Sequence, residues 1–262
     1  TCCNKNNGQK DMLPLYSMST AKYSLMETVS GAAHVSTDDI LGHELFVYNR
    51  ESASIWGADE EFISAQQLDD LQCAFSSMKG FLYGEKNNYL ALHCVFDNEE
   101  VGSGTKQGAA STFLRDTLQR IHEVLGYDRE DYRIHLANSL MLSADNAHAV
   151  HPNHTDMADP TNRPYPNNGI GIKFNANQNY FTWAGAAAMF CCICMLSYVP
   201  VQTFTNRSDI AGGSTLGNIS NTQVALNTVD IGLPQLAMHS PYETAGVKDT
   251  EYLVRAAQEF FN

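Results

Sequence analysis

Hydrophobic side chains recur at helical spacing in the middle of the chain. Leu68, Leu71, Phe75, Met78 and Leu82 lie three or four positions apart, so a helix over 67–83 has one apolar face. Further helices are expected over the ranges 110–125, ended by Gly126, 129–137, 181–198 and 247–261.

Short apolar runs lie between these helices and predict strands. The runs are Glu44–Tyr48, Tyr89–Phe96, Leu140–Ser143, Ile170–Asn175 and Val201–Thr205. Strands separated by helices of this length are typical of parallel sheets. We therefore expect an α/β fold with a mostly parallel sheet covered by helices on both faces.

The alternation of strands and helices begins near residue 60. Residues 1–58 are mixed in character, with a Lys/Asn-rich start and a turn around Pro14, and they cannot make a domain alone. The pattern therefore divides the chain into residues 1–58 and a main unit over 59–262.

Length and charge exclude several classes of protein. The chain has 262 residues, of which 44% are hydrophobic and 17% charged, which is enough for one substantial core. Sixteen basic and 29 acidic residues give a net charge of −13. Because no Lys/Arg cluster stands out, neither a nucleic acid nor an anionic membrane surface is expected as a partner.

The uncharged run Phe181–Phe204 has the length of a membrane span but not its composition. It is rich in Ala, Gly, Cys and Ser, contains Pro200, and lacks flanking Lys or Arg. A spanning helix needs about 20 strongly apolar residues with interfacial anchors. We therefore expect a buried helix that leads into a strand.

The cysteines indicate a reducing compartment. Their number, seven, is odd, and the crowded groups Cys2/Cys3 and Cys191/Cys192/Cys194 do not suggest a disulfide framework. The chain also begins with Thr1 and lacks an initiator Met, so we expect it to be part of a longer protein.

Candidate chemistry lies where apolar segments end. Four such segments lead into acidic side chains or a histidine, namely Asp69, Glu99 with Glu100, Asp145, and His239. In open α/β sheets, ligands bind beyond the carboxyl ends of the strands, so these side chains could face one site. Their carboxylates would repel one another unless cations neutralise them, and mixed O/N ligands suit zinc. A two-metal hydrolase is the natural hypothesis, although each carboxylate taken singly could be a solvated loop residue.

The adjacent pair Glu99-Glu100 is the most informative of these. In extended or turn-like backbone, neighbouring side chains point to different sides. One glutamate can therefore coordinate a metal while the other reaches a metal-bound water as a general base.

Five ordered motifs add a resemblance to a known family. They are Asp97-Asn-Glu-Glu-Val-Gly-Ser103, the segment Ser143–Asn153, Lys173-Phe-Asn-Ala-Asn-Gln178, Asn206–Asp209 with Gly212–Gly217, and Val229–Ser240. Together they resemble the M18 family, the aspartyl aminopeptidases. The resemblance implies a cytoplasmic metallo-aminopeptidase with two zinc ions, assembled as a large homo-oligomer, that removes N-terminal and preferably acidic residues from peptides.

The resemblance also implies roles for individual residues. Glu99 would be the general base that takes the proton of the metal-bridging water. Glu100, Asp145 and His239 would be metal ligands, and Asp69 would bridge the two metals. Lys173 would meet an acidic substrate side chain, and His148 would lie near the substrate. Without the family, Lys173 would be an ordinary exposed strand lysine.

The chain departs from the family pattern at its beginning. The family supplies a first histidine ligand on a His-x-Asp motif, and His34, His43 and His93 lie in the wrong contexts for it. Asp145 would then lack its histidine partner, so one zinc site should be weak. Residues 1–58 would be the C-terminal remnant of a dimerisation domain, followed by an incomplete catalytic domain.

Two further expectations follow from these departures. The apolar segment Met189–Tyr198 could form an oligomer contact, since its relatives carry charged residues there. The alternative to an aminopeptidase is a truncated, non-catalytic homologue that acts as an assembly partner.

Overall fold

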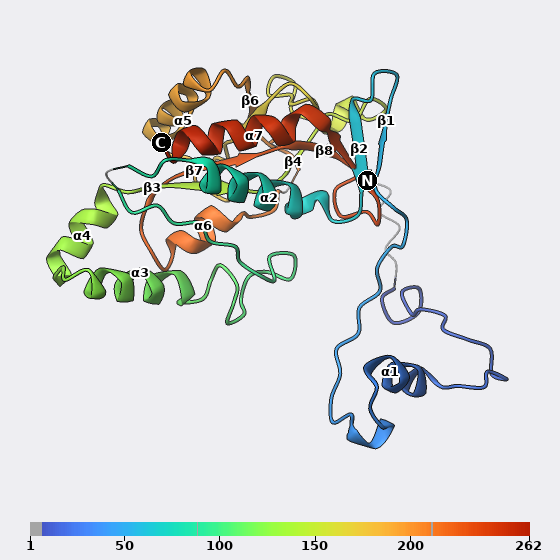
Figure 1. Cartoon of the computed structure of the whole chain (residues 1–262). Coiled ribbons are helices and arrows are strands. Elements are labelled where there is room, and N and C mark those ends of the chain that lie inside the picture. The colour runs from blue at the N-terminus through green and yellow to red at the C-terminus, as the bar shows by residue number, and fades with distance from the viewer. Residues whose placement is uncertain (1–6, 88, 211) are drawn as a thin grey trace. The chain divides into compact units, whose positions relative to one another are not determined.

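The computed structural model describes residues 7–87, 89–210 and 212–262, so Cys2 and Cys3 lie outside the described residues. The chain divides into two compact units, Thr1–Arg50 and Glu51–Asn262 (Figure 1). Each unit is described by itself.

The first unit contains one helix and little buried surface. Helix α1 (Leu25–Ala33) begins at Ser24, whose side chain accepts from the backbone N–H of Glu27 while the Glu27 carboxylate accepts from the N–H of Ser24. This reciprocal capping satisfies two N–H groups that a helix start leaves unpaired. A 3₁₀ turn, η1 (Thr37–Asp39), follows. Among the described residues of this unit only Ser30 is buried.

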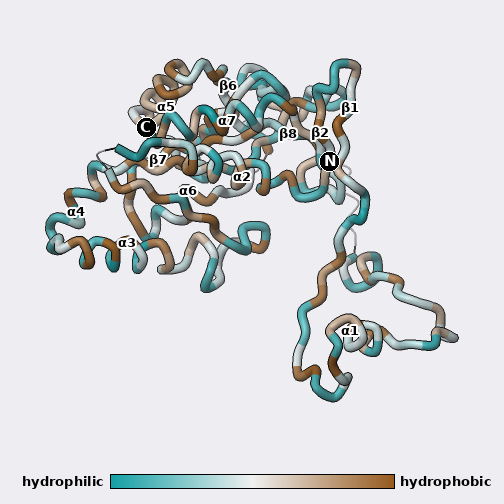
Figure 2. The backbone as a smooth tube through the Cα atoms, viewed as in Figure 1, coloured by the Kyte–Doolittle hydropathy of each residue, from teal (hydrophilic) through white to brown (hydrophobic). Residues whose placement is uncertain are grey.

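The strand predicted at Glu44–Tyr48 is wrong, because the segment pairs with no other strand of the described chain. Phe46 and Val47 are 84% and 80% exposed, and Figure 2 shows hydrophobic stretches along the extended trace of this unit. Apolar character alone does not make a strand, since a strand needs a neighbour for its backbone hydrogen bonds.

The second unit contains the remaining helices and all the strands of the described residues. Its helices are α2 (Leu68–Tyr83), α3 (Phe113–Val124), α4 (Arg129–Ala137), α5 (Ala184–Leu196), α6 (Leu216–Asn221) and α7 (Val247–Phe260), with the 3₁₀ turn η2 (Thr155–Met157). Its strands are β1 (Ser54–Trp56), β2 (Phe62–Ala65), β3 (Leu140–Ala144), β4 (Ala147–His148), β5 (Ile170–Lys173), β6 (Val201–Phe204), β7 (Asn227–Gly232), β8 (Pro234–Leu236) and β9 (Glu243–Gly246).

These strands form two sheets. The four-stranded sheet has the order β3-β7-β5-β6, in which β3 and β7 are parallel, β5 and β6 are parallel, and β5 and β7 are antiparallel. The five-stranded sheet has the order β1-β2-β9-β8-β4 and is antiparallel except for the β4–β8 pair. The α/β class is confirmed, but the pairing is more mixed than the expected mostly parallel sheet.

The hydrophobic core lies between the four-stranded sheet and the helices α2, α5 and α7. Phe190 on α5, Leu253 on α7 and Ile231 on β7 are fully buried in it. Helix α6 packs against β3 and β7 on the other side of the sheet (Figure 1). Helices therefore cover both faces, as expected from the alternating pattern.

The predicted helices are confirmed with small shifts of their ends. The ranges 67–83, 110–125, 129–137, 181–198 and 247–261 correspond to α2, α3, α4, α5 and α7. The predicted strands at 140–143, 170–175 and 201–205 are β3, β5 and β6. The apolar run 181–204 is divided between α5 and β6, and no helix in the described part of the chain is both long and apolar enough to cross a membrane.

The strand predicted at Tyr89–Phe96 is also wrong. The described residues of this segment have no ladder partner, and β3 pairs on one edge only, with β7. The segment and β3 both line one cavity of about 1180 Å³. The apolar pattern is that of a buried strand, but the hydrogen-bonding neighbour that would make it one is not among the described residues.

Candidate metal centre

The first site residues lie at the start of α2. Gln67 takes the left-handed conformation (φ 56°), and Asp69 and Asp70 depart from helical backbone angles before the regular helix begins. The peptide bond between the two aspartates is cis. The Asp69 side chain is only 5% exposed, so this turn brings carboxylates into the interior.

Glu99 and Glu100 lie on a closed loop after the Tyr89–Phe96 segment. The N–H of Gly102 donates to the carbonyl of Glu99 (2.8 Å), and the N–H of Ser103 donates to the carbonyl of Asn98 (2.9 Å). Both glutamates line the large cavity beside Asp69. The loop therefore fixes the backbone of the pair next to the start of α2.

Asp145 follows β3 directly, and its N–H donates to the carbonyl of Ile231 (3.1 Å) as a continuation of the β3–β7 ladder. Its carboxylate Oδ2 lies 3.3 Å from Nζ of Lys173, which also donates to the carbonyl of Asn146 at 2.7 Å. Because Lys173 is 3% exposed, the alternative of an ordinary exposed strand lysine is wrong.

Lys173 is held in its charged form. Burial alone would lower the pKa of the Lys173 ammonium, but the neighbouring carboxylates of Asp145 and Asp230 outweigh burial and raise it. Its predicted contact with an acidic substrate stays a prediction, because both described hydrogen bonds of Nζ go to the protein itself.

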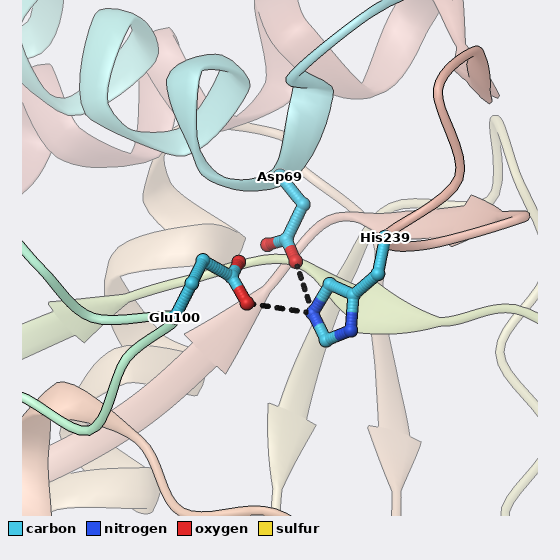
Figure 3. A group of neighbouring side chains, drawn as sticks. All are labelled: Asp69, Glu100 and His239. Carbon is cyan, nitrogen blue, oxygen red and sulfur yellow. Dashed lines mark ion pairs between the residues drawn. The ribbon is translucent and has the colours of Figure 1, made fainter. Parts of the chain in front are cut away.

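His239 completes a group with Asp69 and Glu100. It lies in the loop after β8, and its Nε2 is 3.2 Å from Oδ2 of Asp69 and 3.1 Å from Oε2 of Glu100. Figure 3 shows the three side chains pointing toward one another from three separate segments. Three residues from distant parts of the sequence thus offer two oxygens and one nitrogen at one point.

A second group shares Asp69 with the first. Ligand atoms of Asp69, Asp70 and Asp145 lie within 4.8 Å of one another. The prediction placed Asp69 between two metals and left Asp145 without a histidine, and this group of described residues likewise contains no histidine. Asp70 was not among the predicted ligands, although its position beside Asp69 was the available signal.

The crowding of these carboxylates changes their proton affinity. Burial first, and then the charges of Asp145 and Glu100, raise the pKa of Asp69 to about 8. Burial, followed by Asp145 and Glu100, raises the pKa of Glu99 to about 7, against the opposing effect of Lys173 and His239. Burial first, and then the charges of Asp145 and Asp69, raise the pKa of Asp70 well above its ordinary value.

These residues fit a zinc ion. The Oδ1 atoms of Asp69 and Asp70 are buried and have no hydrogen-bond partner in the described chain, although buried polar atoms are normally paired. Carboxylate oxygens and an imidazole nitrogen are usual zinc ligands. A bound cation would pair with the free oxygens and offset both the burial and the repulsion that raise the pKa values.

His148 lies on β4, at a second cavity of about 330 Å³. Gly212, Gly213, Asn206 and Tyr180 also line this cavity. Burial first, and then the charges of Lys173 and His239, lower the pKa of His148. His148 therefore interacts electrostatically with residues of the candidate metal centre. Neither candidate metal group of the described residues includes it.

Comparisons with known proteins agree with the motifs. A family model described as aminopeptidase I zinc metalloprotease (M18) matches residues 3–261. The chain is 42% identical over 260 residues to a probable M18 family aminopeptidase 2 of Clostridium novyi. The matched region covers 98% of this chain and 60% of the relative. A relative from Clostridium acetobutylicum is also 42% identical, over 262 residues and the same shares.

Solved structures give the same picture. A cryo-EM structure of the Ape4 and Nbr1 complex matches with a TM-score of 0.81 and 38% identity, over 87% of this chain and 44% of that one. A crystal structure of yeast aminopeptidase 1 matches with a TM-score of 0.78 and 28% identity, over 90% of this chain and 54% of that one. The chain thus spans about 60% of the length of these curated relatives.

The raised pKa values predict how pH changes the stability of the metal-free protein. Asp69 and Glu99 have pKa values of about 8 and about 7 in the folded chain, against 3.8 and 4.5 for ordinary groups. The folded state then binds more protons than the unfolded state between these values, so stability falls as pH rises. We expect the melting temperature measured with chelator present to fall from pH 5 to pH 8, and to fall less with zinc.

Asp69→Asn is the control for this titration, because it removes one of the raised carboxyl groups. The variant should show a shallower fall of the melting temperature over the same range. A metal-free melting temperature that rises from pH 5 to pH 8 would contradict the electrostatic account.

Proposed function

We propose, for a chain that belongs to the M18 family of zinc metalloproteases, that it forms the zinc-binding part of an aminopeptidase that removes N-terminal, preferably acidic, residues from peptides. The observation that carries this proposal is the convergence of Asp69, Glu100 and His239 beside Glu99. The family members named as aminopeptidases do not favour the alternative of a non-catalytic assembly partner.

Zinc would be held by Asp69, Glu100 and His239, with Asp69 shared by a second ion at Asp145 and Asp70. When bound, zinc would polarise the scissile carbonyl and make the attacking water more acidic. Of these residues, Asp145 is a predicted ligand and Asp70 is one that the geometry adds. The two groups differ in donor set, since only the first contains a histidine nitrogen.

Glu99 would be the general base. Glu99 is the chain neighbour of Glu100 and lines the same cavity as Asp69, and a general base must lie within reach of the proton that it takes. Glu99 would accept a proton from the attacking water and return it to the amino group that leaves. It belongs to neither ligand group of the described residues, so its carboxylate is free for this task.

Lys173 and His148 would act on the substrate. Lys173 is charged and lies beside Asp145, so it would favour an acidic side chain nearby by electrostatic attraction. Burial and neighbouring cations keep the pKa of His148 low, so a neutral imidazole would face the peptide.

We propose separate roles for residues 1–58 and residues 59–262. Residues 1–58 would be the C-terminal remnant of a dimerisation domain, supported by the exposed apolar side chains of the first unit. Residues 59–262 would be an incomplete catalytic domain, supported by the cavity beside β3 and by the edge of β3 that has no partner strand among the described residues. We also propose a cytoplasmic location. It is supported by the free thiols of Cys73, Cys94, Cys191, Cys192 and Cys194.

A zinc titration tests the unequal ligand sets. We expect the chain to bind one zinc tightly, at Asp69, Glu100 and His239, and a second weakly, with little or no peptidase activity on its own. The measurement is competition with a chromophoric chelator. Two equally tight sites, or robust turnover of an aspartyl-amide substrate by the chain alone, would count against the prediction.

Glu99→Gln tests the role of the general base in the complete reading frame that encodes this chain. Loss of proton transfer should lower kcat on aspartyl and glutamyl substrates by about 10²–10⁴-fold, with zinc content unchanged. Glu123→Gln, an exposed glutamate on α3, is the matched control and should keep full activity. The proposed function fails if the complete protein with zinc hydrolyses no N-terminal residue, or if Glu99→Gln is fully active.

We also propose that the end of α5 contacts a second copy of the chain. Met195, Leu196 and Tyr198 are 73%, 66% and 86% exposed, which is unusual for neighbouring large apolar side chains. A structure of the Saccharomyces cerevisiae mApe1 dodecamer is among the matching structures, with a TM-score of 0.77.

Cys192→Lys tests this contact, because Cys192 is exposed on the same helix. A buried lysine charge would weaken an apolar interface, so the mass measured by light scattering should fall. Gln119→Lys, which adds the same charge at an exposed position of α3, should leave the mass unchanged. An oligomer of unaltered size in Cys192→Lys would remove the idea.

A further inference from the structure

Glu243 is a buried acid that the proposed chemistry does not use. It is the first residue of β9 and is 2% exposed, and no ion pair of the described residues involves it. β9 lies between β2 and β8, so its backbone is paired on both sides, with Glu243 opposite Ala65. A carboxylate in such a place needs strong hydrogen-bond donors.

The donors come from the backbone of two candidate ligands. Oε2 of Glu243 accepts from the N–H of Asp69 at 2.9 Å, and Oε1 accepts from the N–H of His239 at 2.6 Å. One carboxylate therefore joins the start of α2 to the loop after β8. These are the two segments whose side chains meet at the His239 Nε2–Asp69 Oδ2 distance of 3.2 Å.

Both backbones take unusual conformations at the residues that donate to Glu243. His239 has a φ of 65°, in the left-handed region that non-glycine residues disfavour. Asp69 has non-helical angles (φ −85°, ψ 113°) at the first turn of α2, where N–H groups have no partner within the helix. A charged acceptor satisfies both N–H groups with stronger hydrogen bonds than a neutral one.

We propose that Glu243 is a positioning residue that sets the separation of Asp69 and His239 and thereby the affinity of the zinc site. Glu243 is not itself a ligand, since both of its oxygens are occupied by backbone donors. The inference rests on the proposed function, because it assumes that zinc binds at these two residues.

Glu243→Gln is the informative substitution, because it keeps size and changes one acceptor. The glutamine amide offers a single oxygen, and its NH₂ group would face a backbone N–H, so one of the two hydrogen bonds is lost. Substitution of a residue that hydrogen-bonds to a metal ligand typically lowers metal affinity by about 10–100-fold. We expect zinc affinity in the full chain, measured by chelator competition, to fall by about that factor.

The control is a buried acid with the same chemistry elsewhere. Asp249 is fully buried on α7, and its carboxylate accepts from the N–H groups of Asn167 and Gly169. It belongs to neither candidate metal group. Asp249→Asn should lower the melting temperature of the chain, yet leave the zinc dissociation constant within about twofold of the original, well below the change expected at an outer partner of a ligand.

Cobalt separates positioning from simple loss of stability. The visible spectrum of Co²⁺ at the same site should change in Glu243→Gln and stay unchanged in Asp249→Asn. Glu243→Asp keeps the charge and both acceptors on a shorter side chain, so it should fold and bind zinc with an intermediate affinity, even if Glu243→Gln does not fold.

Three outcomes would overturn the inference. The first is an original chain that binds zinc while Glu243→Gln and Glu243→Asp bind it equally well with the original cobalt spectrum. The second is an equal loss of zinc affinity in Asp249→Asn, which would mean that Glu243 acts only through stability. The third is an original chain that takes up neither zinc nor cobalt, which overturns the proposed function and this inference with it.

Discussion

Several carboxylates are buried side by side at one place in the second unit of this protein. Asp69, Asp70 and Asp145 lie within ligand distance of one another, and Glu99 and Glu100 lie beside them. Ionised groups this close and this poorly solvated cannot all keep their charge without cations. In the metal-free chain the raised pKa of Asp69 favours its protonated form, and the buried ammonium of Lys173 pairs with Asp145. A divalent metal bound between the carboxylates would neutralise the remaining charge.

The same constraint explains the dense hydrogen bonding around the candidate metal centre. Cys73 on α2 donates to Oδ1 of Asn146, and the Asn146 amide in turn donates to Gln72 and Gln235. This buried network joins α2, the turn that carries Asp145, and β8. Glu243 does the same for the turns that carry Asp69 and His239. Charged ligands that repel one another stay in place only if the backbone beneath them is held.

Local pattern was sufficient wherever an element packs on the core by one face. The helix 67–83 follows from the spacing of its apolar residues, and Cys73 of this helix belongs to the hydrophobic core. Pattern failed at Glu44–Tyr48 and Tyr89–Phe96, because a strand exists only with a neighbour. The antiparallel strands β1, β2 and β9 were also missed, since they are short and the pairing of β2 with β9 joins segments about 180 residues apart.

The sequence by itself determined the α/β class, the family, and four of the segments that carry the candidate ligands. These follow from residue types and their order, which are local properties. Only the tertiary structure added Asp70 to Asp145, buried Lys173 against Asp145, and placed Glu243 between two ligand backbones. The physical reason is that hydrogen bonds and charge contacts between distant segments depend on how the strands pair, and no periodicity in the chain records that pairing.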